Sequence, residues 1–458
     1  MVNQLKEFYY LHKNFKERAM KQLSSLFIMI QSILLFNCHN HGNPSPNFII
    51  IMADDLGYGE LSSYGSKSIQ TPHIDRLAKE GLRFTDYHSN GAVCSPTRAA
   101  LLTGQYQQRS GLEGVIYVKG ETRQVGMETS TTTFAELLQA KGYATGIMGK
   151  WHLGYKKEYF PTRHGFDEFH GYVSGNVDYH TRYDNAGIYD WWHNEDSLVE
   201  EGYVTDLITH HGIDFIKKNR DRPFCLYLAH EAPHSPYQGR NDPGIRFPGK
   251  EFSYDGSVED KNRAYKEMVE VMDEGIGRIM ATLKELELDD NTLVFFCSDN
   301  GAVGKYGDNG KLRGTKTTLW EGGHRVPAIA RWKGHIFPGT SDATVMSFDL
   351  APTMIALSGG GTDHETTFDG INISPVLFGT ATSFDRALVW RYRNQSAVRK
   401  DRWKLMVEEG DTLLFDLAND LSEKVNIVRQ HPAVAKALAG VLGEWNKGVR
   451  GKVEQKTE

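Results

Sequence analysis

The sequence contains few cysteines, no excess of positive charge and no long apolar run. Its 458 residues include 4 cysteines, too few for the disulfide framework of a small secreted domain. Lysine and arginine number 52 against 58 aspartate and glutamate residues, so the net charge of −6 gives no basic surface for a nucleic acid. The apolar run at residues 23–36 is short for a membrane span. We find no internal repeat or low-complexity segment, and the length suits a sizeable core and two domains.

Residues 1–43 are predicted to form an export leader and a linker. A short apolar run close to the N-terminus is typical of a signal peptide. Cys38 follows this run and resembles the lipid-bearing cysteine of bacterial lipoproteins, although Asn37 departs from the usual small residue. The sequence leaves open a lipid anchor at Cys38 or plain secretion, and a start at Met1 or Met20. In each case we expect an exported protein, periplasmic, anchored at the outer membrane through Cys38, or secreted.

Four apolar runs are each followed by a group of reactive polar residues. The runs cover residues 48–53, 143–148, 223–229 and 293–298. Because they lack polar alternation, they indicate strands buried on both faces, and the helical patterns between them indicate an α/β sheet flanked by helices. Sites in such sheets form beyond the carboxyl ends of the strands, so the polar groups are expected to converge on one edge.

The pattern changes after about residue 360. Shorter alternating runs are followed by a helix-like stretch, at residues 387–391, 403–407, 412–416 and 432–445. Alternation of this kind predicts a small antiparallel sheet packed with a terminal helix. We therefore predict a large α/β domain over residues 44–365 and a C-terminal α+β subdomain over residues 366–458.

Oxygen-bearing side chains follow two of the apolar runs. Asp54 and Asp55 come after the first run, and Asp299 and Asn300 come after the last. Adjacent carboxylates repel each other unless a positive charge joins them. Three carboxylates and an amide oxygen suit Ca²⁺ or Mg²⁺ rather than zinc. The alternative is a pair of solvated turns, which are common for aspartate.

Cys94 begins a segment, C-S-P-T-R-A-A-L-L-T-G, that has the pattern of a capped helix. We expect Ser95 to cap the helix, Pro96 to occupy its first position and Gly104 to end it. Cys94 then lies at the end of the helix that attracts anions, and Arg98 adds a planar fork for an oxyanion. The simpler interpretation of an isolated cysteine is a buried apolar residue.

This segment resembles the sulfatase signature C-x-P-x-R with its L-x-T-G tail. Three further motifs agree with the family: G-K-W-H-L-G at residues 149–154, A-P-H at 232–234 and R-G-x-K-x-x-x-W-E-G-G at 313–323. The resemblance is to the type I sulfatases of the alkaline phosphatase superfamily. It implies that a maturation enzyme converts Cys94 to formylglycine and that one calcium ion is bound. The matched calcium ligands are Asp54, Asp55, Asp299 and Asn300.

The resemblance also implies roles for the other matched positions. Lys150 would steady the formylglycine and the sulfate, Lys316 would bind the sulfate, and His152 would handle the proton of a formylglycine hydroxyl. Asp299 would accept the proton of the attacking hydroxyl, and His234 or Lys316 would protonate the leaving alcohol. Along an extended segment, Lys150 and His152 are expected to point to one face.

Residues 175–194 are the candidate region for substrate specificity. Polar groups lie there near aromatic rings, which is what a sugar requires, although a core role for the tryptophans is equally open. The region resembles sulfatases that act on galactose-type sugars, so we expect a sulfated saccharide of galactose or N-acetylgalactosamine type. The candidate substrate residues are Asp178, His180, Trp191, Trp192 and His193.

Two other functions stay open at this point. A phosphomonoester or phosphonate hydrolase of the same superfamily shares the metal chemistry, but it normally uses a serine or threonine nucleophile and often zinc. A non-catalytic glycan-binding lipoprotein is expected to lose Cys94, Arg98 or a metal ligand, and this sequence keeps all of them. We therefore expect a sulfuric ester hydrolase.

Overall fold

The computed structural model of the protein describes residues 45–250, 260–360 and 367–449, together with Lys6, Tyr10, His12 and Met20. The rest of the predicted leader, including Cys38, lies outside the described residues. Residues Ser45–Glu458 belong to one compact unit. The boundary that we predict at residue 365 stays a prediction.

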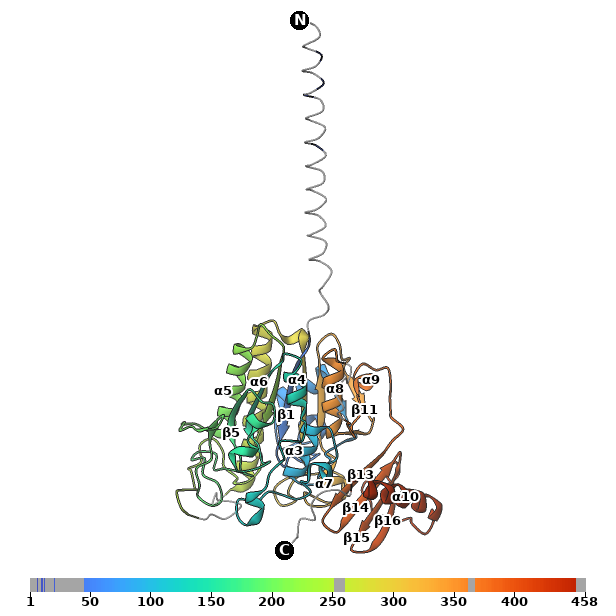
Figure 1. Cartoon of the computed structure of the whole chain (residues 1–458). Helices are drawn as coiled ribbons and strands as arrows, with labels where there is room; N and C mark the ends of the chain where they lie inside the picture. Colours follow the sequence, from blue (N-terminus) through green and yellow to red (C-terminus); the bar gives the residue numbers. More distant parts are fainter. Residues whose placement is uncertain are drawn as a thin grey trace. The chain divides into compact units, whose positions relative to one another are not determined.

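A ten-stranded sheet forms the centre of this unit, in the order β11-β2-β10-β9-β1-β8-β4-β5-β6-β7 (Figure 1). Its four middle strands are parallel and contain the four apolar runs: β9 (Thr292–Ser298), β1 (Asn47–Ala53), β8 (Phe224–Ala229) and β4 (Ala144–Lys150). Every residue of these strands is buried, which explains the lack of polar alternation. Parallel pairing brings their carboxyl ends to the same edge of the sheet.

The outer strands make the sheet mixed. On one side, β10 (Ala328–Arg331) runs antiparallel to β9 and is followed by β2 (Leu82–Phe84) and β11 (Gly339–Ser341). On the other side, β5 (Glu168–Tyr172) runs parallel to β4, and β6 (Trp192–His193) and β7 (Asp196–Ser197) continue antiparallel. A separate parallel pair consists of β3 (Tyr87–His88) and β12 (Val345–Met346).

Helices cover both faces of the large sheet. Alternate side chains of β1 enter two separate hydrophobic clusters, as the pleat of a strand requires. One cluster includes residues of α3 (Cys94–Thr103), α4 (Phe134–Gln139) and α8 (Leu350–Leu357). The other includes residues of α2 (Pro72–Glu80), α5 (Val204–Lys218) and α6 (Lys261–Glu285). The short helices are α7 (Glu321–His324) and α9 (Ser374–Leu377).

The C-terminal part is an antiparallel sheet of four strands with a helix packed on it (Figure 1). The strands, in order, are β13 (Ala387–Tyr392), β14 (Gln395–Lys400), β15 (Trp403–Glu408) and β16 (Asp411–Asp416). Helix α10 (Pro432–Gly448) contributes Ala435, Leu438 and Leu442 to the same buried cluster as the sheet. The predicted fold class, a large mixed sheet flanked by helices with a smaller antiparallel sheet plus helix, is confirmed.

Two expected absences concern the part of the chain that the structure describes. Its cysteines, Cys94, Cys225 and Cys297, are all free and buried. None of its helices combines the length and the apolar character that crossing a membrane requires.

Candidate functional site

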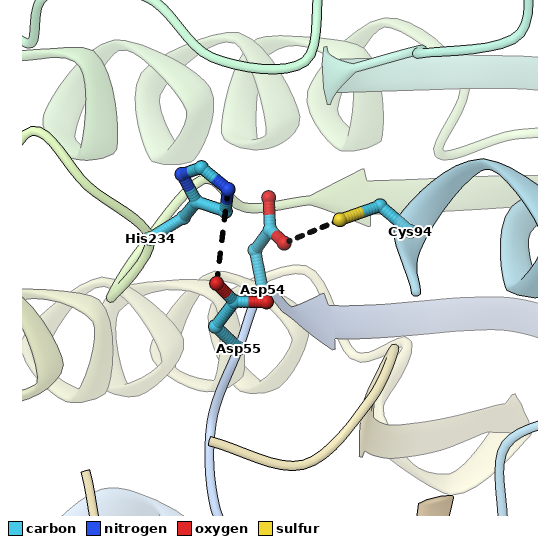
Figure 2. A group of neighbouring side chains, drawn as sticks. All are labelled: Asp54, Asp55, Cys94 and His234. Carbon is cyan, nitrogen blue, oxygen red and sulfur yellow. Dashed lines mark hydrogen bonds and ion pairs between the residues drawn. The ribbon is translucent and has the colours of Figure 1, made fainter. Parts of the chain in front are cut away.

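The ends of the four middle strands bring the predicted site residues together. Asp54 and Asp55 follow β1, Asp299 follows β9, Lys150 ends β4 and His234 lies in the loop after β8. Since β9, β1, β8 and β4 are neighbours in the sheet, these side chains meet at one edge. Figure 2 shows the two aspartates between the thiol of α3 on one side and the histidine of the β8 loop on the other.

The cysteine opens α3, as its sequence indicates, but the capping differs from the prediction. Helix α3 begins at Cys94 with Val93 as the N-cap residue and no side-chain cap. The prediction that Ser95 caps the helix is wrong, because the helix starts earlier and the Ser95 hydroxyl accepts a hydrogen bond from the Ile116 amide at 3.2 Å. Gly104 ends the helix in the left-handed conformation, with φ +66°, as predicted.

Asp54 lies at the centre of the cluster. Its Oδ1 is 3.5 Å from Cys94 Sγ, and its Oδ2 accepts a hydrogen bond from Lys150 Nζ at 2.5 Å. Arg98 Nη2 lies 3.7 Å from Asp54 Oδ2 and donates to Asp299 Oδ2 at 3.1 Å. All five side chains are buried, so these charges interact with little screening by water.

Asp55 gathers a second set of partners. Lys316 Nζ lies 2.7 Å from Asp55 Oδ1, and Asn300 Nδ2 donates to the same oxygen at 2.7 Å. His234 Nε2 is 3.7 Å from Asp55 Oδ2 (Figure 2). The Asp55 amide donates to Asp299 Oδ1 at 3.1 Å, which links the ends of β1 and β9. The residues that sequence analysis predicts for the calcium site therefore lie together at this edge.

Two of the carboxyl groups have pKa values that shift in opposite directions. Burial raises the pKa of Asp299 to about 6, and the neighbouring charge of Asp54 acts in the same direction. Burial also opposes ionisation of Asp55, but the charges of Lys316 and His234 hold its pKa at about 2. An additional positive charge at this cluster would therefore relieve the repulsion between Asp54 and Asp299.

The backbone conformation at His152 differs from the one predicted. The expectation of an extended segment is wrong at this residue, because His152 has φ +60°. Its Nε2 is 2.9 Å from the Ile116 carbonyl oxygen, and its buried Nδ1 has no partner among the described residues. A carbonyl accepts only, so Nε2 carries the proton and Nδ1 is a free acceptor. Burial, followed by the charge of Lys150, lowers the pKa of His152 well below its usual value.

The oxygen donors of the cluster fit a hard divalent cation. Asp54, Asp55, Cys94 and His234 each offer a ligand atom within 4.8 Å of the others. The side-chain oxygen of Asn300 is buried and has no hydrogen-bond partner in the described part of the chain, because only its nitrogen bonds to Asp55 and Gly301. An unpartnered buried oxygen beside carboxylates suits Ca²⁺ or Mg²⁺.

Two of the predicted substrate residues lie in the interior. Asp178 is 0% exposed, and its carboxylate accepts hydrogen bonds from the amides of Thr181 at 2.9 Å and Ile245 at 2.7 Å. Trp191 is 0% exposed and donates to Glu200 Oε2 at 2.9 Å. We correct the expectation for both, because Asp178 ties two loops together and the ring of Trp191 presents no face to a saccharide.

The other three candidates are accessible but do not join the strand-end cluster. His180 Nε2 lies 3.1 Å from the Gly239 carbonyl oxygen, Trp192 packs edge-on against Phe160, and His193 is exposed. Within the described ranges, no hydrogen bond connects these three side chains to the cluster around Asp54. Their role in substrate binding stays a prediction.

Two residues near the cluster were missed by sequence analysis. Asn176 Nδ2 donates to the Ser235 carbonyl at 3.0 Å and lies 3.5 Å from His234 Nδ1, so it links the 175–184 segment to the histidine loop. Tyr227, on β8, accepts a hydrogen bond from Arg98 Nη1 at 3.4 Å. A loop asparagine and a strand tyrosine carry no local pattern that predicts such long-range contacts.

Comparison with known proteins identifies the family. The profile described as Sulfatase matches residues 46–360, more than half of the chain. The chain belongs to the sulfatase family. This sulfatase is 31% identical over 475 residues to steryl-sulfatase of Rattus norvegicus, covering 82% of this chain and 80% of that protein. It is 34% identical over 460 residues to arylsulfatase A of Bos taurus, covering 86% of each.

Further relatives agree with this assignment. The N-acetylgalactosamine-6-sulfatase of Homo sapiens is 36% identical over 358 residues, covering 72% of this chain and 66% of that protein. The crystal structure of Ps i-CgsB has a TM-score of 0.79 at 32% identity, covering 88% of this chain and 92% of that one. The same protein in complex with k-i-k-neocarrahexaose has a TM-score of 0.80. The chain is therefore a sulfuric ester hydrolase.

Proposed function

We propose that this sulfatase hydrolyses sulfate monoesters on saccharides of galactose or N-acetylgalactosamine type, with formylglycine formed at Cys94 and one bound calcium ion. The observation that carries the proposal is the position of Cys94, 3.5 Å from Asp54 in a buried cluster of carboxylates and cations. The saccharide class is supported by the names of two relatives, N-acetylgalactosamine-6-sulfatase and the enzyme in complex with neocarrahexaose.

The calcium ion would be held by Asp54, Asp55, Asp299 and Asn300. Bound there, it supplies positive charge to the sulfate oxygens and to the formylglycine. The charge balance supports this, since the three carboxylates are matched by Arg98, Lys150 and Lys316. A bound divalent cation would give the cluster a net positive charge, which would attract a sulfate monoester. Magnesium is the alternative ion for the same oxygen ligands.

Cys94 itself has little nucleophilic character before modification. Burial raises the pKa of its thiol to about 12, so the thiolate is scarce at neutral pH. Formylglycine would supply a hydroxyl oxygen as the nucleophile at the same position. Arg98, Lys150 and Lys316 would bind the oxygens of the sulfate and stabilise the charge that moves toward the leaving oxygen. A formylglycine-generating enzyme is therefore a required partner.

The proposed proton-transfer roles are those that the family resemblance implies, and hydrogen-bond partners bear on the roles of the two histidines. Asp299 is the acceptor for the proton of the attacking hydroxyl, and His152 Nδ1 is the free acceptor for the step that releases sulfate. His234 Nδ1 lies 2.6 Å from the Ser235 carbonyl oxygen and must donate to it, which leaves Nε2 as an acceptor. Burial lowers the pKa of His234 to about 3, so the Lys316 ammonium is the better proton donor to the leaving alcohol.

Export belongs to the same proposal. The predicted leader at residues 1–43 would direct the enzyme out of the cytoplasm, to the compartment in which it would meet a sulfated polysaccharide. A lipid anchor at Cys38 would be its only attachment to a membrane, and secretion without an anchor is the alternative. Mass spectrometry of the mature N-terminus distinguishes the two outcomes.

The first test of the function is a desulfation screen on defined sulfated saccharides after co-expression with a maturing enzyme. Peptide mass spectrometry should show Cys94 as an aldehyde or its hydrate, and Cys94→Ala should lose turnover while it keeps the fold. Full activity with only unmodified Cys94 would contradict the mechanism. Stoichiometric zinc with a preference for phosphate monoesters would favour the phosphatase alternative.

The second test concerns the sugar. His180→Ala should reduce turnover of a galactose-type saccharide far more than turnover of a small aryl sulfate, because only the saccharide uses the outer contacts. An equal loss on both substrates would place His180 at the sulfate itself or in the scaffold, for example through its contact with Gly239. No loss on either would exclude His180 from substrate binding.

A further inference from the structure

One hairpin of the C-terminal sheet lies against the segments that carry the catalytic residues. Strands β13 and β14 are joined by a two-residue turn at Arg393, and Tyr392 pairs with Gln395 beside the turn. Gln395 Oε1 accepts a hydrogen bond from the Leu319 amide at 2.8 Å. Leu319 lies three residues after Lys316, so the hairpin contacts the segment that positions this lysine.

The same hairpin shares a hydrophobic cluster with the residues that precede α3. Tyr392 belongs to a buried cluster that includes Ala92 and Val93, and Val93 directly precedes Cys94. The Thr317 amide donates to the Ala92 carbonyl oxygen at 2.9 Å, which joins the cysteine segment to the lysine segment beside the hairpin. Tyr392 therefore shares one hydrophobic cluster with residues of both segments, Val93 before Cys94 and Leu319 after Lys316.

The electrostatic surroundings of Tyr392 agree with this position. Burial raises the pKa of its phenol, Arg393 and Lys316 act in the opposite direction, and Tyr117 and Cys94 raise it further. Charges of the catalytic centre and of the hairpin turn therefore both reach this phenol. Tyr117 comes from another segment, one residue after Ile116, whose carbonyl oxygen lies 2.9 Å from His152 Nε2.

Buried ion pairs fix the sheet that carries the hairpin. Arg399 on β14 binds Asp86 through two hydrogen bonds of 2.6 Å. On β15, Lys404 Nζ lies 2.9 Å from Glu321 Oε1 and 2.8 Å from Glu423 Oε1. Because these groups are buried and paired across elements, the hairpin is held in one position relative to the catalytic loops.

Two exposed side chains, Arg393 of the hairpin turn and Tyr117 of another segment, suit an anionic sugar. Arg393 is exposed, and no carboxylate pairs with it in the described part of the chain; its Cζ lies 5.2 Å from the centre of the Tyr392 ring. Tyr117 is 53% exposed, so its ring is accessible to a ligand. A free guanidinium binds carboxylate or sulfate oxygens, and an exposed ring stacks on the apolar face of a sugar.

We propose that Arg393 and Tyr117 form a subsite for the sugar adjacent to the one whose sulfate is removed, and that this neighbouring sugar carries a carboxylate or a second sulfate. The substrate class is then a saccharide with an anionic group on each of two neighbouring units. This inference rests on the proposed saccharide sulfatase function. Carboxylate and sulfate share the same recognition by arginine, so the experiment includes one substrate of each kind.

Arg393→Asn is the central variant, because Arg393 has φ +52° and asparagine adopts the left-handed region readily. Three matched disaccharides carry the scissile sulfate and a neighbouring sugar that is uncharged, carboxylated or sulfated. For the two anionic neighbours, the variant should raise KM about tenfold, roughly the effect of one lost charge-assisted hydrogen bond. For the uncharged neighbour and for 4-methylumbelliferyl sulfate, kcat/KM should stay unchanged.

The control variants separate this role from a structural one. Arg393→Lys should keep most of the preference for anionic over uncharged neighbouring sugars. Tyr117→Ala should raise KM for every disaccharide and leave kcat/KM for the aryl sulfate unchanged. Arg429→Asn removes another exposed arginine and should leave KM and kcat unchanged for all substrates. Ile427, two residues before Arg429, hydrogen-bonds to Leu414 on β16, which lies three strands, or roughly 14 Å, from β13 in the sheet.

If Arg393→Asn raises KM for only one of the two anionic disaccharides, that substrate identifies whether the subsite binds a carboxylate or a sulfate. Wild type that does not discriminate among the disaccharides, or Arg393→Asn with unchanged ratios, overturns the proposal. Wild type that hydrolyses none of the sulfate esters, aryl sulfate included, refutes the proposed function itself, so the two failures are distinguishable.

Discussion

The substitution Lys150→Met should have opposite effects on calcium binding and on turnover. Lys150 Nζ donates to Asp54 Oδ2 at 2.5 Å, and this oxygen belongs to the proposed calcium site. Lysine and a metal ion therefore compete for the charge of one carboxylate. Removing the lysine leaves Asp54 with Arg98, whose Nη2 is 3.7 Å away.

The size of the effect follows from these contacts. Loss of one partner of a buried ion pair costs about 3–5 kcal/mol, and the remaining Arg98 places Lys150→Met near the lower end, at about 3 kcal/mol. An unfolding entropy of about 2.1 cal/mol/K per residue, over the roughly 410 residues from Ser45 to Glu458, gives about 0.9 kcal/mol per degree. The metal-free variant should therefore melt about 3 °C below the metal-free wild type.

Calcium should reverse this loss in the variant, because a divalent cation replaces the missing charge beside Asp54. Calorimetry with a chelator and with saturating calcium should show a larger rise of Tm in Lys150→Met than in wild type, by about 3 °C. Turnover should fall about 10²–10³-fold in the same variant, since an interaction with the transition state is lost. Lys156→Met is the control, because within the described ranges this exposed lysine pairs with Glu158 alone, at 3.8 Å.

Equal calcium shifts in wild type and Lys150→Met would refute the competition for Asp54. A smaller shift in the variant would mean that the lysine supports metal binding. Retained turnover with a normal Tm would remove Lys150 from the catalytic cluster altogether.

Three further predictions concern other buried polar and charged groups. Lys404→Met should lower the free energy of unfolding by about 3–5 kcal/mol in chemical denaturation, because Glu423 loses its cation while Glu321 keeps Arg325 at 3.1 Å, and adding Glu423→Gln should recover part of that loss. Burial raises the pKa of Glu60 from 4.5 to about 8, so this group stabilises fully below pH 4.5 and loses its contribution as pH rises through 8. Glu60→Gln should flatten that slope in unfolding curves at successive pH values. Asn300→Ala should weaken calcium binding in calorimetric titration, and an unchanged Kd would exclude its oxygen as a ligand.

The middle of the fold could be predicted because its signal is local. The runs at residues 48–53 and 293–298 are apolar throughout, since both faces of β1 and β9 are covered by helices. Strand β14 (Gln395–Lys400) was not predicted, because its charged end residues hide the pattern. Its Arg399 is paired with Asp86, more than 300 residues away in the sequence, and no local pattern indicates such a partner.

The site shows the same limit. Motif spelling and strand ends were sufficient to bring Cys94 and Asp54 together, because parallel strands fix where the loops begin. The position of His152 depends on a positive φ and on the Ile116 carbonyl, neither of which alternation describes. Asp178 has the polarity of a sugar-binding residue, yet its carboxylate serves backbone amides of two loops that the sequence does not connect.

The charge balance of the cluster explains how one set of residues serves both stability and catalysis. Three buried carboxylates would repel one another strongly, and Arg98, Lys150 and Lys316 compensate them within hydrogen-bonding distance. In the proposed function, a divalent cation would take over part of this role, so that Arg98, Lys150 and Lys316 would also be able to bind the oxygens of an incoming sulfate ester. The three cations would need no new positions for this, because they already lie at the strand ends before a substrate arrives.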